Sequence, residues 1–506
     1  MLISKIENYV LPQGWSKCCL PDFTDVVMGQ SPSSDTYNKN ESGIPFFQGK
    51  AEFGAIYPTV AKYCSAPNKI ALAGATLLSV RAPVGPTNLA KEKCCIGRGL
   101  AAIHPVGGIS PMFVLYLLRS IEADISKEGT GSTFSAINKQ FVEEMEFGLP
   151  PLHEQHRIVA KIEELFSELD KGIENLKTAQ AQLKVYRQAL LKHAFEGKLT
   201  AQWRAENRDK LETAEVLLKR IRQERAQRFQ QQLADWEAAC KQGSKPKAPK
   251  PLAPLTAEEL AELPELPEGW GWARVLEVCE TVVDCHNKTA PYQATGIPLV
   301  RTPSIRDMKL NFDDSIRYVS QETYTFWSRR CPPLSGDILF TREAPMGEAA
   351  IIPEGKIVCM GQRIMLLRPG KFLSGKYLLC ATQNPIFKKV SDKVAVGTGV
   401  KHLRVGDVER LVFPLCSVNE QNEIANQLDA RLSEVDQLDQ TITTSLQQAE
   451  ALRQSILKKA FSGQLVKQDP HDEPASALLA RIKAEQAVGA KNAHTAAKPR
   501  KTAGRK

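Results

Sequence analysis

Residues 189–200 read ALLKHAFEGKLT, and residues 455–466 read SILKKAFSGQLV. The second stretch repeats the first 266 positions later (455 minus 189), about half the chain away. Repetition over such a distance indicates two related halves. In both stretches a Phe is followed two residues later by a Gly, which favours the left-handed conformation that ends a helix. The repeated stretch therefore predicts two equivalent helix ends.

The repeat extends through both halves of the chain. Each half begins with a Leu-Pro-x-Gly-Trp motif, and further paired stretches follow in the same order. The pairs are LPQGW (11–15) with LPEGW (266–270), GATLLSVRAPVG (74–85) with GDILFTREAPMG (336–347), CIGRGLAAIHP (95–105) with CMGQRIMLLRP (359–369), and LPPLHEQHRI (149–158) with PLCSVNEQNEI (414–424). The chain thus has the order A–B–A′–B′.

The A segments, residues 1–150 and 266–415, contain short β-type runs interrupted by Gly and Pro. Examples are residues 75–80 and 338–341. This punctuation is typical of a compact domain of mixed secondary structure with many turns. The two A segments diverge strongly in detail, which indicates related but different tasks.

The B segments, residues 151–200 and 416–466, are each predicted to contain a long helix of roughly 40 residues, or about 60 Å at 1.5 Å per residue. Apolar residues recur every seven positions, and we call these residues the seam. The seam comprises Ile162, Leu169, Leu176, Leu183 and Leu190, and then Leu428, Val435, Ile442, Ala449 and Ile456. Companion positions are Ile158, Leu165, Ile173, Ala179 and Tyr186 in the first helix and Ile424, Leu432, Leu438 and Leu446 in the second.

A sustained seven-residue apolar repeat predicts a partner helix. Because the chain carries two such helices, we expect them to pair with each other within one molecule. The alternative is that each helix packs on its own A segment.

Two further segments complete the chain. Residues 201–265 are predicted to form a charged helix, with a basic cluster between Lys219 and Arg228, followed by a Pro/Lys-rich linker. Residues 467–506 end in KPRKTAGRK and are predicted to be a basic, disordered tail.

Composition narrows the function classes. The 506 residues carry a formal charge of +9, which is compatible with a polyanionic partner but does not require one. No stretch of about 20 apolar residues and no secretion signal is present, so we expect a cytoplasmic protein without a membrane partner. The 12 cysteines include no Cys-x-x-Cys pair, so we expect reduced thiols and no metal site.

Three stretches resemble catalytic motifs, but each departs from its motif at a required position. GKFLSGKY (370–377) has Tyr377 where a P-loop has its magnesium-binding hydroxyl. Asn384-Pro385-Ile386-Phe387 departs at its third residue from the motif with which adenine methyltransferases hold the target amine. His153-Glu154-Gln155-His156 has the wrong spacing for a zinc helix. We therefore predict a protein without catalytic residues.

Two related heads suit a target with two different half-sites, as in two-fold readers of DNA. Polar residues on the Gly-rich turns of each head are the candidate contacts, because Arg reads guanine with two hydrogen bonds and other cations bind phosphates. The candidates are Lys50, Arg81, Arg98, Ser132 and Lys139 in the first head and Arg301, Arg306, Arg342, Arg363, Lys401 and Arg404 in the second.

The combination of motifs resembles the specificity subunits of type I restriction-modification systems. The residues that carry the resemblance are the two Leu-Pro-x-Gly-Trp starts, LPPLHEQHRIVAKIEELF (149–166), VYRQALLKHAFEGKLTAQWR (185–204), NEQNEIANQL (419–428) and QSILKKAFSGQLV (454–466). The resemblance covers essentially the whole chain except for the basic tail.

The resemblance implies an α+β fold in which two target-recognition domains are joined by two long helices that form an antiparallel intramolecular coiled coil. Each domain would read one half of an asymmetric, interrupted site in double-stranded DNA. The helices would set the spacer and dock two methyltransferase subunits, and two restriction endonuclease/translocase subunits would complete the assembly. S-adenosylmethionine would belong to the methyltransferase, ATP and Mg to the endonuclease, and no cofactor to this chain.

Two alternatives come from other classes of protein. One is a single-chain DNA adenine methyltransferase whose cofactor site escapes recognition. The other is a coiled-coil scaffold that joins proteins and does not bind DNA.

Overall fold

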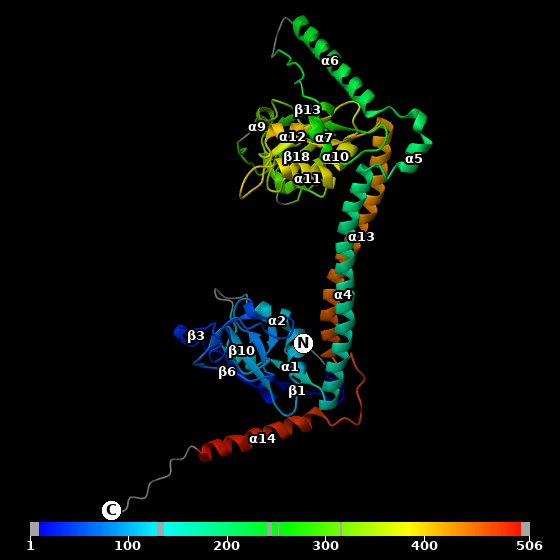
Figure 1. Ribbon diagram of the computed structural model, residues 1–506. Helices are drawn as coiled ribbons and strands as arrows, with labels where there is room; N and C mark the ends of the chain where they lie inside the picture. The colour runs from blue at the N-terminus through cyan, green and yellow to red at the C-terminus, as the bar shows by residue number, and fades with distance from the viewer. Residues whose placement is uncertain are drawn as a thin grey trace, which may run out of the picture. The chain divides into compact units, whose positions relative to one another are not determined.

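The computed structural model describes residues 10–128, 136–239, 245–250, 252–286, 288–313 and 316–496, with side chains described as far as residue 488. It forms two compact units. Unit 1 combines Met1–Lys177 with Thr443–Lys506, and unit 2 is Thr178–Ile442. Each unit contains a head, which we define as strands β1 to β11 (head 1) and β12 to β22 (head 2) (Figure 1).

Head 1 contains three sheets. The strand orders are β2-β10-β7-β8, β3-β5-β4-β9-β6 and β1-β11. The strands are β1 (Ser16–Cys19), β2 (Thr24–Met28), β3 (Tyr37–Asn38), β4 (Ile44–Phe47), β5 (Tyr63–Cys64), β6 (Ile70–Ala71), β7 (Thr76–Ser79), β8 (Thr87–Leu89), β9 (Cys94–Ile96), β10 (Leu100–Pro105) and β11 (Glu146–Leu149). The short helices are η2 (Leu20–Asp22), η3 (Ser34–Thr36), η4 (Lys50–Glu52), α1 (Pro111–Ser120), α2 (Glu122–Glu128) and α3 (Lys139–Glu143).

Head 2 has a corresponding set of strands. Its main orders are β13-β21-β18-β19, β17-β14-β20 and β12-β22. The strands are β12 (Gly271–Arg274), β13 (Cys279–Asp284), β14 (Ile297–Val300), β15 (Ile305–Arg306), β16 (Lys309–Leu310), β17 (Arg317–Val319), β18 (Ile338–Thr341), β19 (Ala349–Ile351), β20 (Cys359–Met360), β21 (Ile364–Pro369) and β22 (Val412–Leu415). The helices of unit 2 are α5 (Ala201–Glu206), η5 (Arg208–Lys210), α6 (Ala214–Ala238), α7 (Ala257–Ala261), α8 (Val275–Val278), η6 (Thr302–Ser304), α9 (Gln321–Trp327), α10 (Gly375–Gln383), α11 (Pro385–Val394) and α12 (Val405–Arg410).

The two heads share one topology. Both have an antiparallel four-stranded sheet whose second strand is β10 or β21, and both contain one parallel pair, β4 with β9 or β14 with β20. The alternating apolar residues of these strands are buried, including Leu77 and Ala101 in head 1 and Leu339 and Met365 in head 2. The predicted α+β class with two related mixed domains is therefore confirmed.

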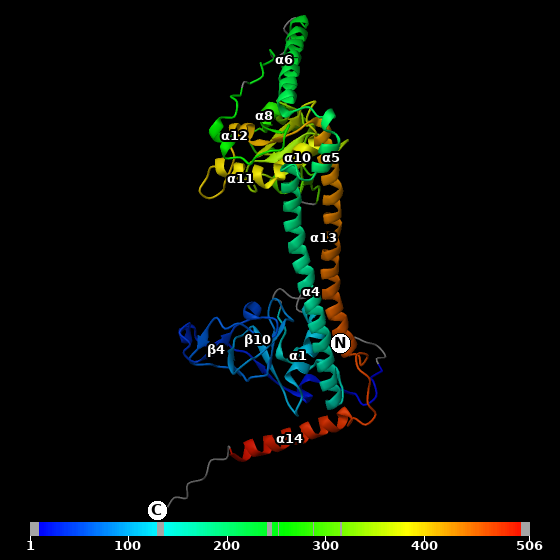
Figure 2. The same cartoon turned by 45° about the vertical axis from the view of Figure 1, so that its right-hand side comes forward.

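The two predicted long helices are present. They are α4 (Leu152–Phe195) and α13 (Val418–Ala460), and the division into units falls within both of them. Figures 1 and 2 show a segment of each helix beside the other in each unit. Both helices end at a glycine with positive φ, +70° at Gly197 and +73° at Gly463, which explains the Gly of the repeated stretch.

Seam residues face inward in both units. Ile162, Leu190 and all five residues of the second helix are buried, and Leu169, Leu176 and Leu183 are half-buried. In unit 2, Gln180 donates to Asp439 and Arg187 pairs with Asp436, so the two segments run antiparallel. In unit 1, Arg453 pairs with Asp170 and lies 4.8 Å from the Phe166 ring centroid. The paired-helix prediction is confirmed.

Two companion positions were predicted wrongly. Tyr186 and Leu438 are 47% and 53% exposed. A straight α-helix drifts by about 20° per heptad from a strict seven-residue repeat, so a second line of residues turns out of the contact. The alternative of packing on the neighbouring head also contributes, since Ile158 and Ile162 belong to the core of head 1.

The predicted disordered tail is wrong for residues 475–496, which form α14 (Ala475–Ala496). Ala475, Leu478 and Ile482 are buried on unit 1, while residues 483–488 are exposed. Residues 497–506 lie outside the described part of the chain. Helix α14 is a second copy of α6, in which Ala214, Leu217 and Ile221 are buried at the same spacing. The repeat therefore continues beyond the stretch that first revealed it.

The basic cluster of α6 is held by head 2. Arg222 pairs with Glu277, Arg228 pairs with Glu280, and Arg225 donates to the carbonyl of Cys279. These contacts hold α6 against α8 and the first residues of β13, and they neutralise two of the charges. Among the described helices, none is long and apolar enough to cross a membrane.

Candidate nucleic-acid interface

The four-stranded sheet of each head ends in an edge where several turns meet. In head 1 the N–H groups of Gly29, Val80 and Gly97 donate to the carbonyls of Leu100, Gly99 and Phe47, each at 2.9 Å. In head 2 those of Cys285, Arg342 and Gly361 donate to Ile364, Arg363 and Val300 at 3.3, 2.8 and 2.8 Å. We call this the turn edge. It brings together the turns in which most candidate residues lie.

In head 1 the turn edge carries Arg81 and Arg98, both exposed. Lys50 is exposed in η4, close to the same turns. Lys139 begins α3, and its ammonium pairs with Glu143 at 3.1 Å, so its charge is already partnered. Ser132 lies outside the described residues. Three of the five candidates thus belong to one exposed region.

In head 2 the turn edge carries Arg342 and Arg363. Leu403 donates its N–H to the carbonyl of Arg342 at 3.0 Å, which places the neighbouring Lys401 and Arg404 at this edge as well. Arg301 packs against Gly361, since a Cβ there would lie 3.2 Å from its Cγ. Arg363 also pairs with Glu343 at 3.2 Å.

Arg306 is the exception among the head 2 candidates. Its guanidinium donates to the carbonyls of Thr302 and Ile305 at 2.7 and 2.6 Å. It lines a cavity of about 550 Å³ with Arg187 and Asp436 of the paired helices, away from the turn edge. There Lys309 and Arg187 both bond Asp436. Burial opposes ionisation of Asp436, but these bonds outweigh it and lower its pKa.

The two turn edges carry charge at different positions. Arg81 forms a bridge with Ala136, and at the equivalent place Glu343 forms a bridge with His402. Likewise, Val80 of head 1 is equivalent to Arg342 of head 2, because their N–H groups donate to the equivalent carbonyls of Gly99 and Arg363. The backbone framework is therefore shared, while the side chains that it presents are not.

A cluster that sequence reasoning missed adjoins the turn edge of head 2. His286 follows Cys285, and its ring lies 5.4 and 4.9 Å from those of Phe326 and Trp327. The guanidinium of Arg329 stacks 4.0 Å above the centroid of Phe326. The signal in the sequence was the aromatic pair Phe326-Trp327 followed closely by the basic pair Arg329-Arg330.

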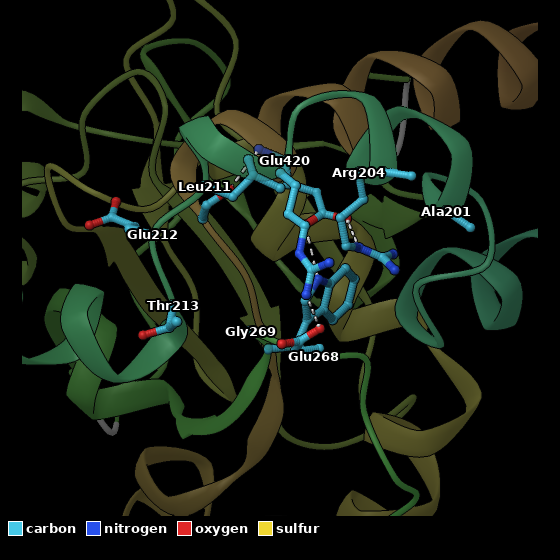
Figure 3. A pocket seen from close by; sticks show the side chains of 12 residues that line it. Ala201, Arg204, Leu211, Glu212, Thr213, Glu268, Gly269 and Glu420 are labelled. Atoms are coloured by element: carbon cyan, nitrogen blue, oxygen red, sulfur yellow. Dashed lines mark hydrogen bonds and ion pairs between the residues drawn. The ribbon is translucent and has the colours of Figure 1, made fainter.

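A second kind of site joins each long helix to a head. In unit 2, Glu420 at the start of α13 accepts hydrogen bonds from Arg204 and Trp270 at 2.8 and 2.9 Å (Figure 3). It also accepts one from the Thr200 hydroxyl at 2.8 Å. Glu420, Arg204 and Trp270 line a cavity of about 450 Å³. Here Phe195, at the end of α4, packs on Tyr377 with ring centroids 5.1 Å apart. We call this the docking site of unit 2.

Unit 1 has the equivalent docking site. Glu154 at the start of α4 accepts from Trp15 at 3.1 Å and from Gln468 at 3.3 Å, and Phe461 at the end of α13 packs on Phe113 at 5.5 Å. Burial raises the pKa of Glu154, although both hydrogen bonds lower it. The Trp of each Leu-Pro-x-Gly-Trp motif thus binds the first turn of a long helix.

The same motif receives the helix that follows each long helix. Ala214 of α6 donates its N–H to the carbonyl of Gly269 at 2.8 Å, and Ala475 of α14 donates to Gly14 at 2.9 Å. Helix α6 of the first half therefore docks on the motif that begins the second half, and α14 of the second half docks on the motif that begins the first. The two repeated stretches, residues 189–200 and 455–466, are the ends of the long helices α4 and α13, which precede α6 and α14 in the chain.

The catalytic near-misses have structural roles. The side chain of Asn384 caps α11 by accepting from the N–H of Ile386 at 3.1 Å, and Glu154 is the buried acceptor of the docking site. Within the described residues, no group of three or more His, Cys, Asp or Glu side chains could hold a metal ion. The 11 described cysteines are free thiols, and Cys240 lies outside the described residues.

Comparisons with known proteins give a consistent family. A putative type I restriction enzyme MjaX specificity subunit from Methanocaldococcus jannaschii is 38% identical over 198 residues, which is 38% of this chain and 46% of that protein. The type I restriction enzyme EcoDI specificity subunit from Escherichia coli is 22% identical over 496 residues, or 94% and 96%.

Similarity of fold to a solved structure also covers most of the chain. A chain from a solved structure on the complex assembly and conformational transition of the type I R-M system matches with a TM-score of 0.60 and 20% identity. The match covers 90% of this chain and 100% of that one. The family model of the type I restriction modification DNA specificity domain matches residues 12–178 and 267–449, one match in each half. The chain belongs to the family of type I restriction-modification DNA specificity proteins.

Proposed function

We propose that each head reads one half of an asymmetric, interrupted site in double-stranded DNA, and that the paired helices set the spacer between the halves. The observation that carries this proposal is the pair of heads with one topology and different side chains at the same edge. A shared framework suits one kind of target, and divergent side chains suit two different sequences.

The chain acts as the recognition subunit of a larger complex. Two methyltransferase subunits dock on the helical region and hold S-adenosylmethionine. Two restriction endonuclease/translocase subunits use ATP and Mg. The near-equivalence of the two docking sites supports two equal methyltransferase positions, because each would meet the same arrangement of helix ends.

Reconstitution tests the division of labour. The chain alone and the chain with its methyltransferase subunits are incubated with DNA and labelled S-adenosylmethionine. We expect methyl transfer only with the partner subunits present. Transfer by the chain alone would show that it is an enzyme. DNA binding is also measured at several salt concentrations on DNAs of different sequence. If binding depends on salt but not on DNA sequence, a scaffold that does not read DNA is favoured.

Heptad insertion tests the spacer. Seven residues inserted near Leu176 and near Ile442 lengthen each helix by roughly 10 Å and preserve the seam. We expect the complex to select a longer spacer with both half-sites unchanged. A control inserts seven Gly/Ser residues in the linker at 245–250, outside the helices, and leaves the spacer as it was. A change in the half-site sequences would contradict the spacer role.

A further inference from the structure

The aromatic cluster of head 2 contains a cation that is already oriented. Arg329 stacks on Phe326, and Phe326 in turn makes edge contacts with His286 and with Trp327, whose ring centroid is 5.5 Å away. An arginine stacked on an aromatic face loses less freedom when its planar fork forms hydrogen bonds. The guanidinium of Arg329 is therefore already oriented to donate hydrogen bonds to a planar acceptor.

Arg329 and its neighbour Arg330 differ in their partners. Arg330 pairs with Asp284 at 2.6 Å. Within the described residues, no carboxylate or carbonyl bonds the guanidinium of Arg329, which is exposed, and Phe326 is 49% exposed. Arg329 can donate hydrogen bonds, and Phe326 offers an exposed aromatic ring beside it. Together they favour a flat ligand with hydrogen-bond acceptors on its edge.

The cluster is continuous with the turn edge. The N–H of Cys285 bonds the carbonyl of Ile364, so His286 stands next to Arg363. Helix α9, which carries Phe326, lies on the side of head 2 away from the paired helix segments (Figure 1). In head 1, Gly29 takes the place of Cys285, and Gln30 therefore takes the place of His286. The aromatic cluster thus distinguishes head 2 from head 1 at one equivalent place.

We propose that Arg329 and Phe326 read part of the half-site of head 2, with Arg329 donating two hydrogen bonds to O6 and N7 of a guanine and Phe326 packing on the neighbouring base. This inference rests on the proposed function of the heads. Arginine recognises guanine in this bidentate way in the major groove, and phenylalanine contacts base edges such as the thymine methyl group. His286 and Trp327 act as positioning residues for the ring.

The test uses the full chain in complex with its methyltransferase subunits and a DNA library randomised across the site. Arg329→Ala and Arg329→Lys both remove the bidentate fork, and Lys retains the charge. We expect both to lose the preference for one G·C pair, by about 5- to 150-fold, in one half-site only. Arg330→Ala is the matched control and keeps that preference, because Arg330 is already paired with Asp284.

Phe326→Ala has its own control. We expect it to weaken discrimination at the neighbouring position of the same half-site. Phe312 is 39% exposed, and Lys356 lies 5.9 Å from its centroid, so Phe312→Ala removes a similar exposed ring stacked by a cation elsewhere on head 2. We expect Phe312→Ala to select the wild-type site.

Three outcomes would overturn the inference: an unchanged guanine preference in Arg329→Ala, full retention in Arg329→Lys, or equal losses in both half-sites. Full retention in the lysine variant would show a charge contact rather than base reading. If the wild-type complex selects no bipartite site at all, the proposed function of the heads fails, independently of Arg329.

Discussion

Unit 1 and unit 2 are alike where helices dock and unlike where the heads present their turn edges. Glu154 and Glu420 bind the Trp of equivalent motifs, and Phe461 and Phe195 pack on equivalent aromatic rings. By contrast, Arg81 of head 1 faces the same way as Glu343 of head 2. The proposed function accounts for this difference: two equal methyltransferase subunits would need equivalent docking ends, and two different half-sites would need different edges.

The largest expected effect comes from removing the docking aromatics. Phe195 is fully buried in unit 2 and Phe461 is 5% exposed in unit 1. We expect Phe195→Ala and Phe461→Ala each to lower the free energy of unfolding by about 3–5 kcal/mol. Hydrogen exchange locates the loss, with Phe195→Ala loosening unit 2 and Phe461→Ala loosening unit 1. Leu452→Ala, at a 50% exposed position of α13, is the control with little effect. Equal loosening of both units by either variant would contradict two separate docking sites.

An intermediate effect distinguishes the two docking carboxylates. Glu420 binds the charged Arg204, so Glu420→Gln should cost about 2–3 kcal/mol. Glu154 binds only neutral donors, so Glu154→Gln should cost about 0.5–1.5 kcal/mol. Denaturant unfolding measures both. Equal costs would show that the charge of Arg204 contributes nothing.

The pH dependence sharpens this comparison. Because burial raises the pKa of Glu154 above its usual 4.5, wild-type stability falls as pH rises from 4.5 to the raised value. Glu154→Gln lacks this titration, so the cost of the substitution should shrink over the same interval. A cost that grows with pH would contradict the burial argument.

The smallest expected effect concerns the ion pairs of the paired helices. The side chain of Asp436 is 33% exposed and binds two cations, whereas that of Asp170 is 61% exposed and binds Arg453. We expect Asp436→Asn to cost about 0.5–1 kcal/mol and Asp170→Asn less than about 0.5 kcal/mol. Because the pKa of folded Asp436 is lowered, its contribution is full above pH 3.8 and is lost as pH falls from 3.8 to the lowered pKa. Thermal unfolding at high and low salt measures both variants, and a larger cost at Asp170 would reverse the comparison.

The sequence predicted the parts of the fold that depend on spacing. Seam residues such as Val435 and Ile442 repeat every seven positions, so their burial followed from helix geometry. The match between α6 and α14 was harder to detect, because only Ala475, Leu478 and Ile482 carry it and most of the helix is small or polar.

The candidate site was less predictable, because β-type segments alternate between two faces. A shift of one residue along a strand moves a side chain to the opposite face of the sheet. Arg342 of head 2, for example, lies where head 1 has Val80. No residue pattern indicated that Arg306 bonds the carbonyls of Thr302 and Ile305, or that Arg329 stacks on Phe326. Both contacts lie within four residues along the chain, but neither follows from spacing alone.

The bond from Ala475 to Gly14 also has a consequence for synthesis. A ribosome adds Ala475 461 residues after Gly14 (475 minus 14), so head 1 waits for its closing helix while the chain between them is made. Unit 2 has all of its residues once Ile442 has been added. A chain that terminates before Ala475 therefore lacks α14, so its first motif and the residues around Leu20 in η2 lose the helix that covers them.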